Sequence, residues 1–241
     1  MIRAAGFGGR ARFVRAVLIG LALTLLPGAV RANTITIVGS VDATISDTNG
    51  DGIFDSTTAE NPSTFGLVVR QFENFSSSIS FEDRAVIEFS LAGIAPTDTI
   101  TGLTFTFGES SATSNSGRIV GVYGFAGDGA ISLADATAPA TELASYDNWA
   151  IGLGAHTLTL DPSTLQSLLG HTSYFAIRLQ GDQLSTNTSL NSLEENFGTP
   201  PQITVTTAAP LPSPLRLLAG LGILVACGQW WSRRRAGIRT L

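Results

Sequence analysis

Apolar and polar positions alternate in short segments along the middle of the chain. Eight segments are rich in β-branched or aromatic residues and are bounded by Gly, Asn, Asp, Ser or Pro, the pattern of short strands joined by turns. They are 34–38, 64–72, 84–91, 100–107, 118–125, 156–160, 174–180 and 201–207. In TITIV and FTF the apolar residues alternate with threonine, which predicts one face packed on a core and the other in water.

Only one segment has helical spacing. In PSTLQSLLG, residues 162–170, the leucines share one face, with Pro162 at the start and Gly170 after the end. GDGAISLAD, residues 127–135, is interpreted as a hairpin turn. The whole pattern predicts an all-β fold, a jelly-roll-like antiparallel β-sandwich of about eight strands with one short helix.

Both ends of the chain are apolar and do not fit this pattern. At the N-terminus, four arginines precede AVLIGLALTLLPGAV, and the small residues Val30 and Ala32 stand just before Asn33. This is the build of a secretory signal peptide over residues 1–32. The alternative is a permanent N-terminal anchor, but Pro27 and Gly28 interrupt the apolar run.

The C-terminal segment, residues 210–241, has a different build. A proline cluster is followed by an apolar run from Leu215 to Trp231 and by three arginines. As a helix the run is about 25 Å long, close to the ~30 Å hydrocarbon core of a bilayer. The arginines then favour the cytoplasmic side. We predict a transmembrane helix that anchors an exported domain; the alternative is a buried core helix with a basic end.

The order of these C-terminal features resembles a known sorting signal. AAPLPSPL, the apolar run and the arginine cluster are similar to the PEP-CTERM signal in its VPLPA-type variant. The residues that carry the resemblance are Pro210, Pro212, Pro214, Arg233, Arg234 and Arg235. The resemblance implies a Gram-negative host and an exosortase-like membrane protease as partner. It also implies export through the inner membrane, temporary anchoring, and a final place at the cell surface or outside the cell.

The domain between the two ends, residues 33–209, is strongly acidic. All 19 acidic residues lie in it, against the four arginines Arg70, Arg84, Arg118 and Arg178. Such a surface repels phosphate backbones, so we predict no nucleic-acid partner. From Glu82 to Thr207 the domain resembles DNRLRE-type carbohydrate-binding-like β-sandwich modules. The resemblance rests on RAVIEFSLAGIAPTDTITGLTFTF, VYGFAGDGAISLADA, LTLDPSTLQSLLG and EENFGTPPQITVTT, and it implies a polysaccharide-directed surface protein.

DTNGDGIFD, residues 47–55, is the sharpest local motif. It places oxygen-bearing groups at alternate positions and Gly52 at the sharp turn of a calcium loop. The predicted ligands of a structural calcium ion are Asp47, Asn49, Asp51, Ile53 through its carbonyl, and Asp55. No glutamate stands at the twelfth position, so the motif is closer to a thrombospondin type 3 or dockerin half-loop than to an EF-hand. The alternative is a solvated turn rich in Asp and Asn.

Catalytic motifs are scarce. The two histidines, His156 and His171, belong to no metalloprotease, hydrolase or nucleotide-binding pattern. The acidic pairs Glu82/Asp83 and Glu194/Glu195 have the residue types of a glycosidase, but pairs are expected by chance among so many acids. We predict that the protein is not an enzyme and that no residue is catalytic. A secreted glycan hydrolase or lyase is the alternative from another class.

Tyr146 and Trp149, in SYDNW, are the candidate glycan contacts, because aromatic rings next to polar groups suit sugar binding. The alternative is that Trp149 caps one end of the sandwich. Together these features predict an exported, calcium-stabilised, non-catalytic surface or matrix protein associated with extracellular polysaccharide. A purely structural protein with no specific ligand is the other alternative.

Overall fold

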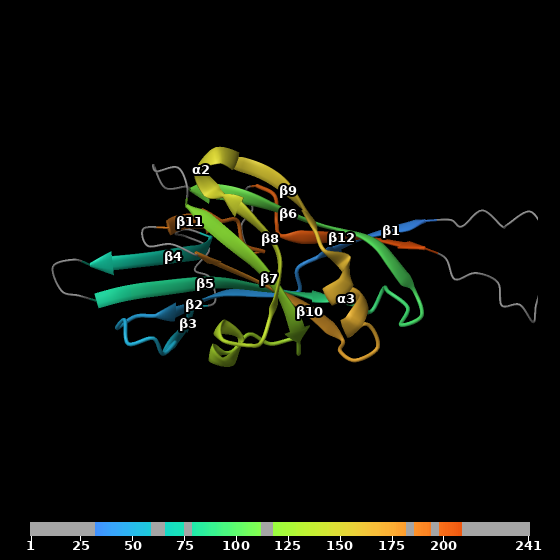
Figure 1. Ribbon diagram of the computed structural model, residues 1–241, viewed down its shortest axis with the longest axis horizontal. Coiled ribbons are helices and arrows are strands. Elements are labelled where there is room, and N and C mark those ends of the chain that lie inside the picture. The colour runs from blue at the N-terminus through green and yellow to red at the C-terminus, as the bar shows by residue number, and fades with distance from the viewer. Residues whose placement is uncertain are drawn as a thin grey trace, which may run out of the picture. The chain divides into compact units, whose positions relative to one another are not determined.

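The computed structural model of the protein describes residues 32–58, 66–74, 79–111, 118–181, 186–193 and 198–208 (Figure 1). The predicted signal peptide, the sorting signal and the pair Glu194/Glu195 lie outside these residues. Within them, no helix is long and apolar enough to cross a membrane. The fold is all-β, as predicted.

Twelve strands, two short α-helices and a 3₁₀ turn make up the described part of the chain. In chain order they are β1 Asn33–Val38, β2 Val41–Asp47, β3 Ser56–Thr58, β4 Leu67–Asn74, β5 Ile79–Ser90, β6 Thr99–Ser111, β7 Ile119–Gly127, η1 Leu133–Ala136, β8 Thr141–Asp147, α2 Asn148–Ile151, β9 Gly154–Leu160, α3 Pro162–Leu168, β10 Tyr174–Gly181, β11 Thr186–Leu190 and β12 Gln202–Ala208. The described residues of all eight predicted strand segments lie wholly or mostly in strands, residues 64 and 65 being outside the described part of the chain, and the predicted helix is α3. The strands β2, β3, β8 and β11 were not predicted.

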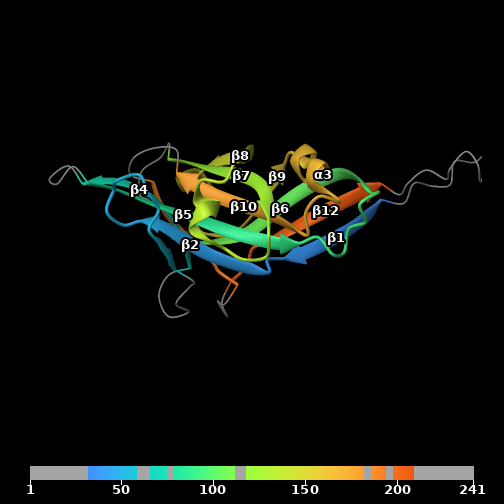
Figure 2. The same cartoon turned by 90° about the horizontal axis from the view of Figure 1, so that it is seen from below.

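The strands form one antiparallel sheet that curls on itself. Its order is β1-β12-β6-β11-β4-β5-β10-β7-β8, with β2 on β5, β3 on β2 and β9 on β6. The two longest strands change partner along their length. β5 pairs with β4 over Ile79–Asp83 and with β10 over Ala85–Ser90, and β6 passes from β12 to β11 near Glu109. These changes of partner allow the sheet to fold over its own core (Figure 2).

The main core lies between the inner faces of the curled sheet. Four phenylalanines, Phe89, Phe105, Phe107 and Phe175, are fully buried in it, and buried leucines from β4, β6, β8, β9, β10 and β11 surround them. Alternation along each strand places these residues inward. α3 closes the core with Leu165, which is also fully buried. Asp161 caps this helix by accepting the N–H of Ser163 at 2.9 Å, and Pro162 occupies its first turn.

A second apolar cluster covers the other face of β5. Ile45, Phe54, Val86, Phe125, Ala136 and Ala176 form it. The β7–β8 connection lies over this face, because the guanidinium of Arg178 donates to the carbonyls of Asp135 and Ala138 at 2.9 and 3.0 Å. β5 is therefore buried on both faces, which places its side chains among the most constrained in the molecule.

The solvent side of β1, β12, β6 and β9 is lined with threonine. Cross-strand registers align Thr36 with Thr204, Thr204 with Thr104, and Thr104 with Thr159. Two pairs are hydrogen-bonded through their hydroxyls, Thr36–Thr204 at 3.3 Å and Thr106–Thr157 at 2.9 Å. The alternation of threonine with apolar residues thus separates a solvent-exposed face of the sheet from a buried face, as predicted.

Candidate functional site

The DTNGDGIFD loop joins β2 to β3. Asp47, at the end of β2, is buried, and its carboxylate holds the loop together. Oδ1 accepts the N–H of Gly50 at 2.7 Å and Oδ2 accepts the N–H of Gly52 at 2.8 Å. Both glycines have positive φ, 75° and 85°, which other residues rarely adopt. The sequence therefore forms a tight loop folded around one carboxylate.

The other predicted calcium ligands lie on the exposed side of this loop. The side chains of Asn49 and Asp51 each accept a backbone N–H two residues ahead, at 3.0 and 2.8 Å. Asp55 accepts the Thr48 hydroxyl at 2.9 Å. Phe54 anchors the loop, because it is buried and lies 4.7 Å from the Arg84 guanidinium. Every ligand candidate thus occupies one loop with a fixed base.

These oxygens do not converge on a common point. Within the described ranges, no group of three or more His, Cys, Asp or Glu side chains is arranged to hold a metal ion. The carboxylates are directed at N–H and O–H donors, although each keeps further lone pairs. Binding of calcium requires Asn49, Asp51 and Asp55 to turn towards Asp47. The calcium site therefore stays a prediction.

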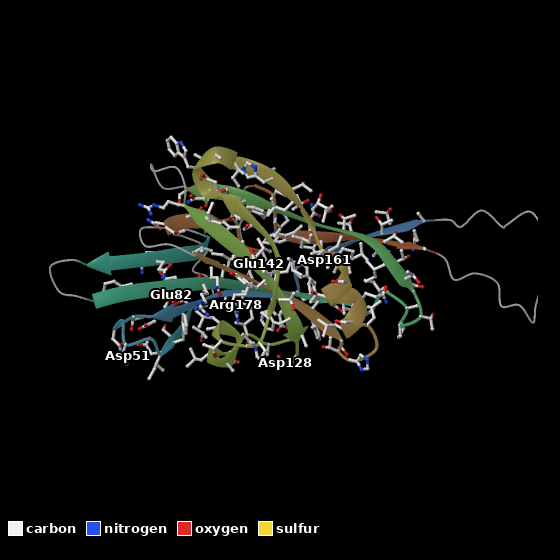
Figure 3. The ribbon with its side chains drawn as sticks, viewed as in Figure 1. Asp51, Glu82, Asp128, Glu142, Asp161 and Arg178 are labelled. Atoms are coloured by element: carbon white, nitrogen blue, oxygen red, sulfur yellow. The ribbon has the colours of Figure 1, made fainter. Side chains whose placement is uncertain are left out.

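The acidic pair Glu82/Asp83 is divided between two arginines. Alternation along β5 points the two side chains to opposite faces of the sheet. Glu82 is paired with Arg84 and Asp83 with Arg70, each at 2.6 Å. Figure 3 shows Glu82 on the β-strand layer, apart from Asp51 in the loop and Asp128 on the β7–β8 connection. Each carboxylate of the pair is thus held by an arginine.

The histidines have local partners. The Nε2 atom of His156 lies 2.8 Å from the carbonyl of Gly152, and its ring packs 5.9 Å from that of Phe107. His171 follows α3, and its backbone N–H donates to the carbonyl of Leu168 at 3.0 Å. Its side chain lines an open hollow at the surface.

GDGAISLAD lies in the connection of a hairpin, because β7 and β8 are consecutive strands that pair antiparallel, but this connection is longer than a tight turn. Gly127 ends β7, η1 follows at Leu133–Ala136, and β8 begins only at Thr141. Glu88 on β5 fixes the start of this connection. Its carboxylate accepts the N–H groups of Asp128 and Gly129 at 3.3 and 2.6 Å. A buried anchor on another strand cannot be seen in the local sequence.

The two predicted glycan contacts are separated by the fold. Trp149 lies on α2 and is 51% exposed, whereas Tyr146 on β8 is 5% exposed and packs 5.4 Å from the ring of Phe107. The pairing of β7 with β8 shifts between Val122 and Tyr123, which leaves Leu143 as an extra residue on β8. This bulge changes the inward positions, so that both Leu143 and Tyr146 are buried. Tyr146 is therefore a core residue and not a ligand contact.

Two buried glutamic acids were missed by sequence reasoning. Glu88 is fully buried, and burial raises its pKa. Glu109 is 3% exposed, and burial raises its pKa to about 7. A hydrogen bond with Thr188 lowers the pKa by a smaller amount. Burial also raises the pKa of Tyr146, with a smaller contribution from the charge of Glu109. The only signal was a glutamate in or next to an apolar run, IEF and FGE.

No family model matches the chain, and no curated protein matches it. The resemblances to the PEP-CTERM signal and to DNRLRE-type modules therefore remain predictions from the sequence.

Proposed function

We propose that the protein is an exported, non-catalytic cell-surface or extracellular-matrix protein whose jelly-roll-like domain contacts polysaccharide. The ends of the chain support export and tail anchoring, and the resemblance to the PEP-CTERM signal supports sorting by an exosortase-like system. The all-β domain supports a binding role, because such sandwiches present side chains on broad faces and at loop ends. In this proposal the two ends of the chain direct the protein out of the cell, and the domain contacts the polysaccharide.

The polysaccharide contact is proposed on one observation, that the Trp149 side chain is exposed to solvent. A single exposed apolar side chain is common on protein surfaces, whereas a group of exposed apolar side chains is typical of an interaction site. Leu153, two residues after the end of α2 at Ile151, is 66% exposed and lies four residues from Trp149 in the sequence. An indole ring stacks on the apolar face of a sugar, while neighbouring polar groups bond its hydroxyls.

The backbone under Trp149 is fixed before any ligand arrives. Asp147 caps α2, and its Oδ1 accepts the N–H groups of Trp149 and Ala150 at 3.0 and 3.2 Å. Asn148, between them, is fully buried. A side chain on a fixed backbone loses less conformational entropy on binding than one on a mobile loop, which favours affinity.

Replacement of Trp149 by alanine is expected to lower retention of the protein on the host's extracellular polysaccharide by about tenfold, the effect of losing one stacked ring worth roughly 1 to 2 kcal/mol. The melting temperature should change little, because the indole is half exposed. Co-sedimentation and thermal unfolding measure the two effects. Leu133→Ala, at an apolar residue of η1 that is 41% exposed, is the matched control. Equal losses of retention and stability in Trp149→Ala would indicate a capping role, and turnover of the polysaccharide would indicate an enzyme.

A further inference from the structure

An open hollow of about 600 Å³ lies between the loop after β5 and the connection from α3 to β10. Its volume falls in the range of roughly 300–1,000 Å³ that small-molecule sites occupy. Three buried apolar side chains, Leu91, Ile94 and Leu169, contribute to its wall. Hydroxyl groups and an imidazole also line it, from Thr172, Ser173, Tyr174 and His171, among others. The hollow thus combines an apolar wall with residues that carry hydroxyl and imidazole groups, although the Thr172 hydroxyl already donates its one proton to the carbonyl of Gly127.

The charge of the hollow differs from that of the domain around it. None of the described residues that line it is acidic, although the domain holds all 19 acidic residues of the chain. It also contains no arginine, so it offers no ion pair to a carboxylate or a phosphate. A neutral ligand with both hydroxyl groups and an apolar face suits this lining best.

Hydrogen bonds within the protein hold the segments that form the wall of the hollow. The Thr172 hydroxyl donates to the carbonyl of Gly127 at 2.7 Å and accepts the N–H of Tyr174 at 3.2 Å. The Leu91 N–H donates to the carbonyl of Ser173 at 2.9 Å, which joins the two sides of the hollow. Such a preformed site has little ordering entropy to lose on binding.

The ring of Tyr174 is positioned by the β7–β8 connection. It lies so close to Gly129 that a Cβ atom there would be 2.8 Å from the ring. Gly129 has a φ of 94° and is held by the buried carboxylate of Glu88. Glu88 is thus a positioning residue: through Gly129 it fixes one aromatic wall of the hollow.

We infer that this hollow binds one sugar unit of a neutral polysaccharide, with its apolar wall against the ring and the hydroxyl and imidazole groups around it. The inference rests on the proposed function and adds a second contact, apart in sequence from Trp149. A protein with two such contacts holds a polymer more tightly than either contact alone, because the second binding event is intramolecular.

The test uses neutral and acidic oligosaccharide fractions cut from the host's own extracellular polysaccharide. Binding is measured by titration calorimetry and by amide shifts in two-dimensional NMR spectra. Ala92 is exposed and lines the hollow, so Ala92→Trp fills it without disturbing the core. Ala134→Trp, at an exposed alanine of η1, is the matched control. Tyr174→Phe removes one hydroxyl, keeps the ring and serves if Ala92→Trp does not fold.

The neutral fraction should shift the amides of residues 91–94 and 170–174. Ala92→Trp should weaken binding about tenfold or more, Tyr174→Phe several-fold, and Ala134→Trp not at all. Shifts confined to the surroundings of Trp149, or unchanged affinity in Ala92→Trp and Tyr174→Phe, overturn the inference and leave the proposed function standing. Binding of the acidic fraction alone overturns it too. Failure of both fractions to bind, with no retention on the intact polysaccharide, contradicts the proposed function itself.

Discussion

Glu109→Gln is expected to stabilise the protein by on the order of 3 kcal/mol well above pH 7. Glu109 is almost fully buried, and its pKa is raised from 4.5 to about 7. A raised acid pKa means that the folded state holds a proton that the unfolded state has already released. Each unit of this difference costs about 1.4 kcal/mol once the pH exceeds both values. Glutamine has the same shape and carries no charge, so it avoids the cost.

The local hydrogen bonds agree with a neutral Glu109. The Thr188 hydroxyl has one proton and contacts both Glu109 Oε1 and the carbonyl of Ser111, the latter at 2.6 Å. If that proton goes to the carbonyl, the contact with Glu109 requires a proton from the carboxyl group. Glutamine supplies the same bond through its amide. The other carboxylate oxygen of Glu109 has no partner in the described part of the chain, and neither has the Tyr146 hydroxyl.

The pH dependence gives the sign of the effect. Well below pH 4.5 the side chain is protonated in both states, so Glu109→Gln and the wild type should be about equally stable. Between pH 4.5 and 7 the wild type loses stability relative to the variant, and above pH 7 the difference stays constant. Urea unfolding across this range measures it. Glu142→Gln, at an exposed residue of β8, is the control. If Glu109→Gln is no more stable than the wild type at pH 8, ionisation of Glu109 does not lower the free energy of unfolding, and the prediction is wrong.

Calcium is expected to raise the melting temperature by about 5 to 10 °C. A ligand present at 100 times its dissociation constant stabilises the folded state by about 2.7 kcal/mol, and 1 kcal/mol corresponds to roughly 2 to 4 °C in a domain of this size. The loop has a fixed base in Asp47 and Phe54, so only its exposed side chains need to move.

Asp51→Ala should abolish the calcium-dependent rise. Asp128→Ala is its matched control, because Asp128 also accepts an N–H two residues ahead, from Ala130 at 3.0 Å, but lies outside the loop. Differential scanning calorimetry with calcium, magnesium and chelator separates calcium binding from a general effect of salt. An unchanged melting temperature in the wild type with calcium would make the loop a turn stabilised only by its own hydrogen bonds.

Alternating apolar residues predicted most of the fold but not the strands with polar interiors. In β2, Asp42 and Thr44 are buried, where Asp42 accepts the N–H of Leu193 at 2.8 Å and Thr44 accepts the N–H of Val68 at 2.9 Å. In β11, Thr186 and Thr188 are fully buried. Such strands are paired with distant segments that satisfy their polar groups, so their sequences read as loops.

The candidate sites were predictable to a smaller extent. The calcium motif and the exposed Trp149 follow from local sequence. The burial of Tyr146 follows from a bulge in the pairing of two strands, and the hollow joins the loop after β5 to the connection before β10. Both depend on contacts between segments far apart in the chain, and no local pattern encodes them.

The measurement that tests the account most directly is the mass of the intact protein and its terminal peptides, from cells and from medium. Every proposed contact requires the domain to be outside the cell. The account predicts a mature chain that begins at Asn33 and ends between Pro210 and Leu215. A chain from the medium or the membrane that retains Arg233 to Leu241 would contradict sorting by an exosortase-like system, and one that also retains residues 1–32 in the cytoplasm would contradict export.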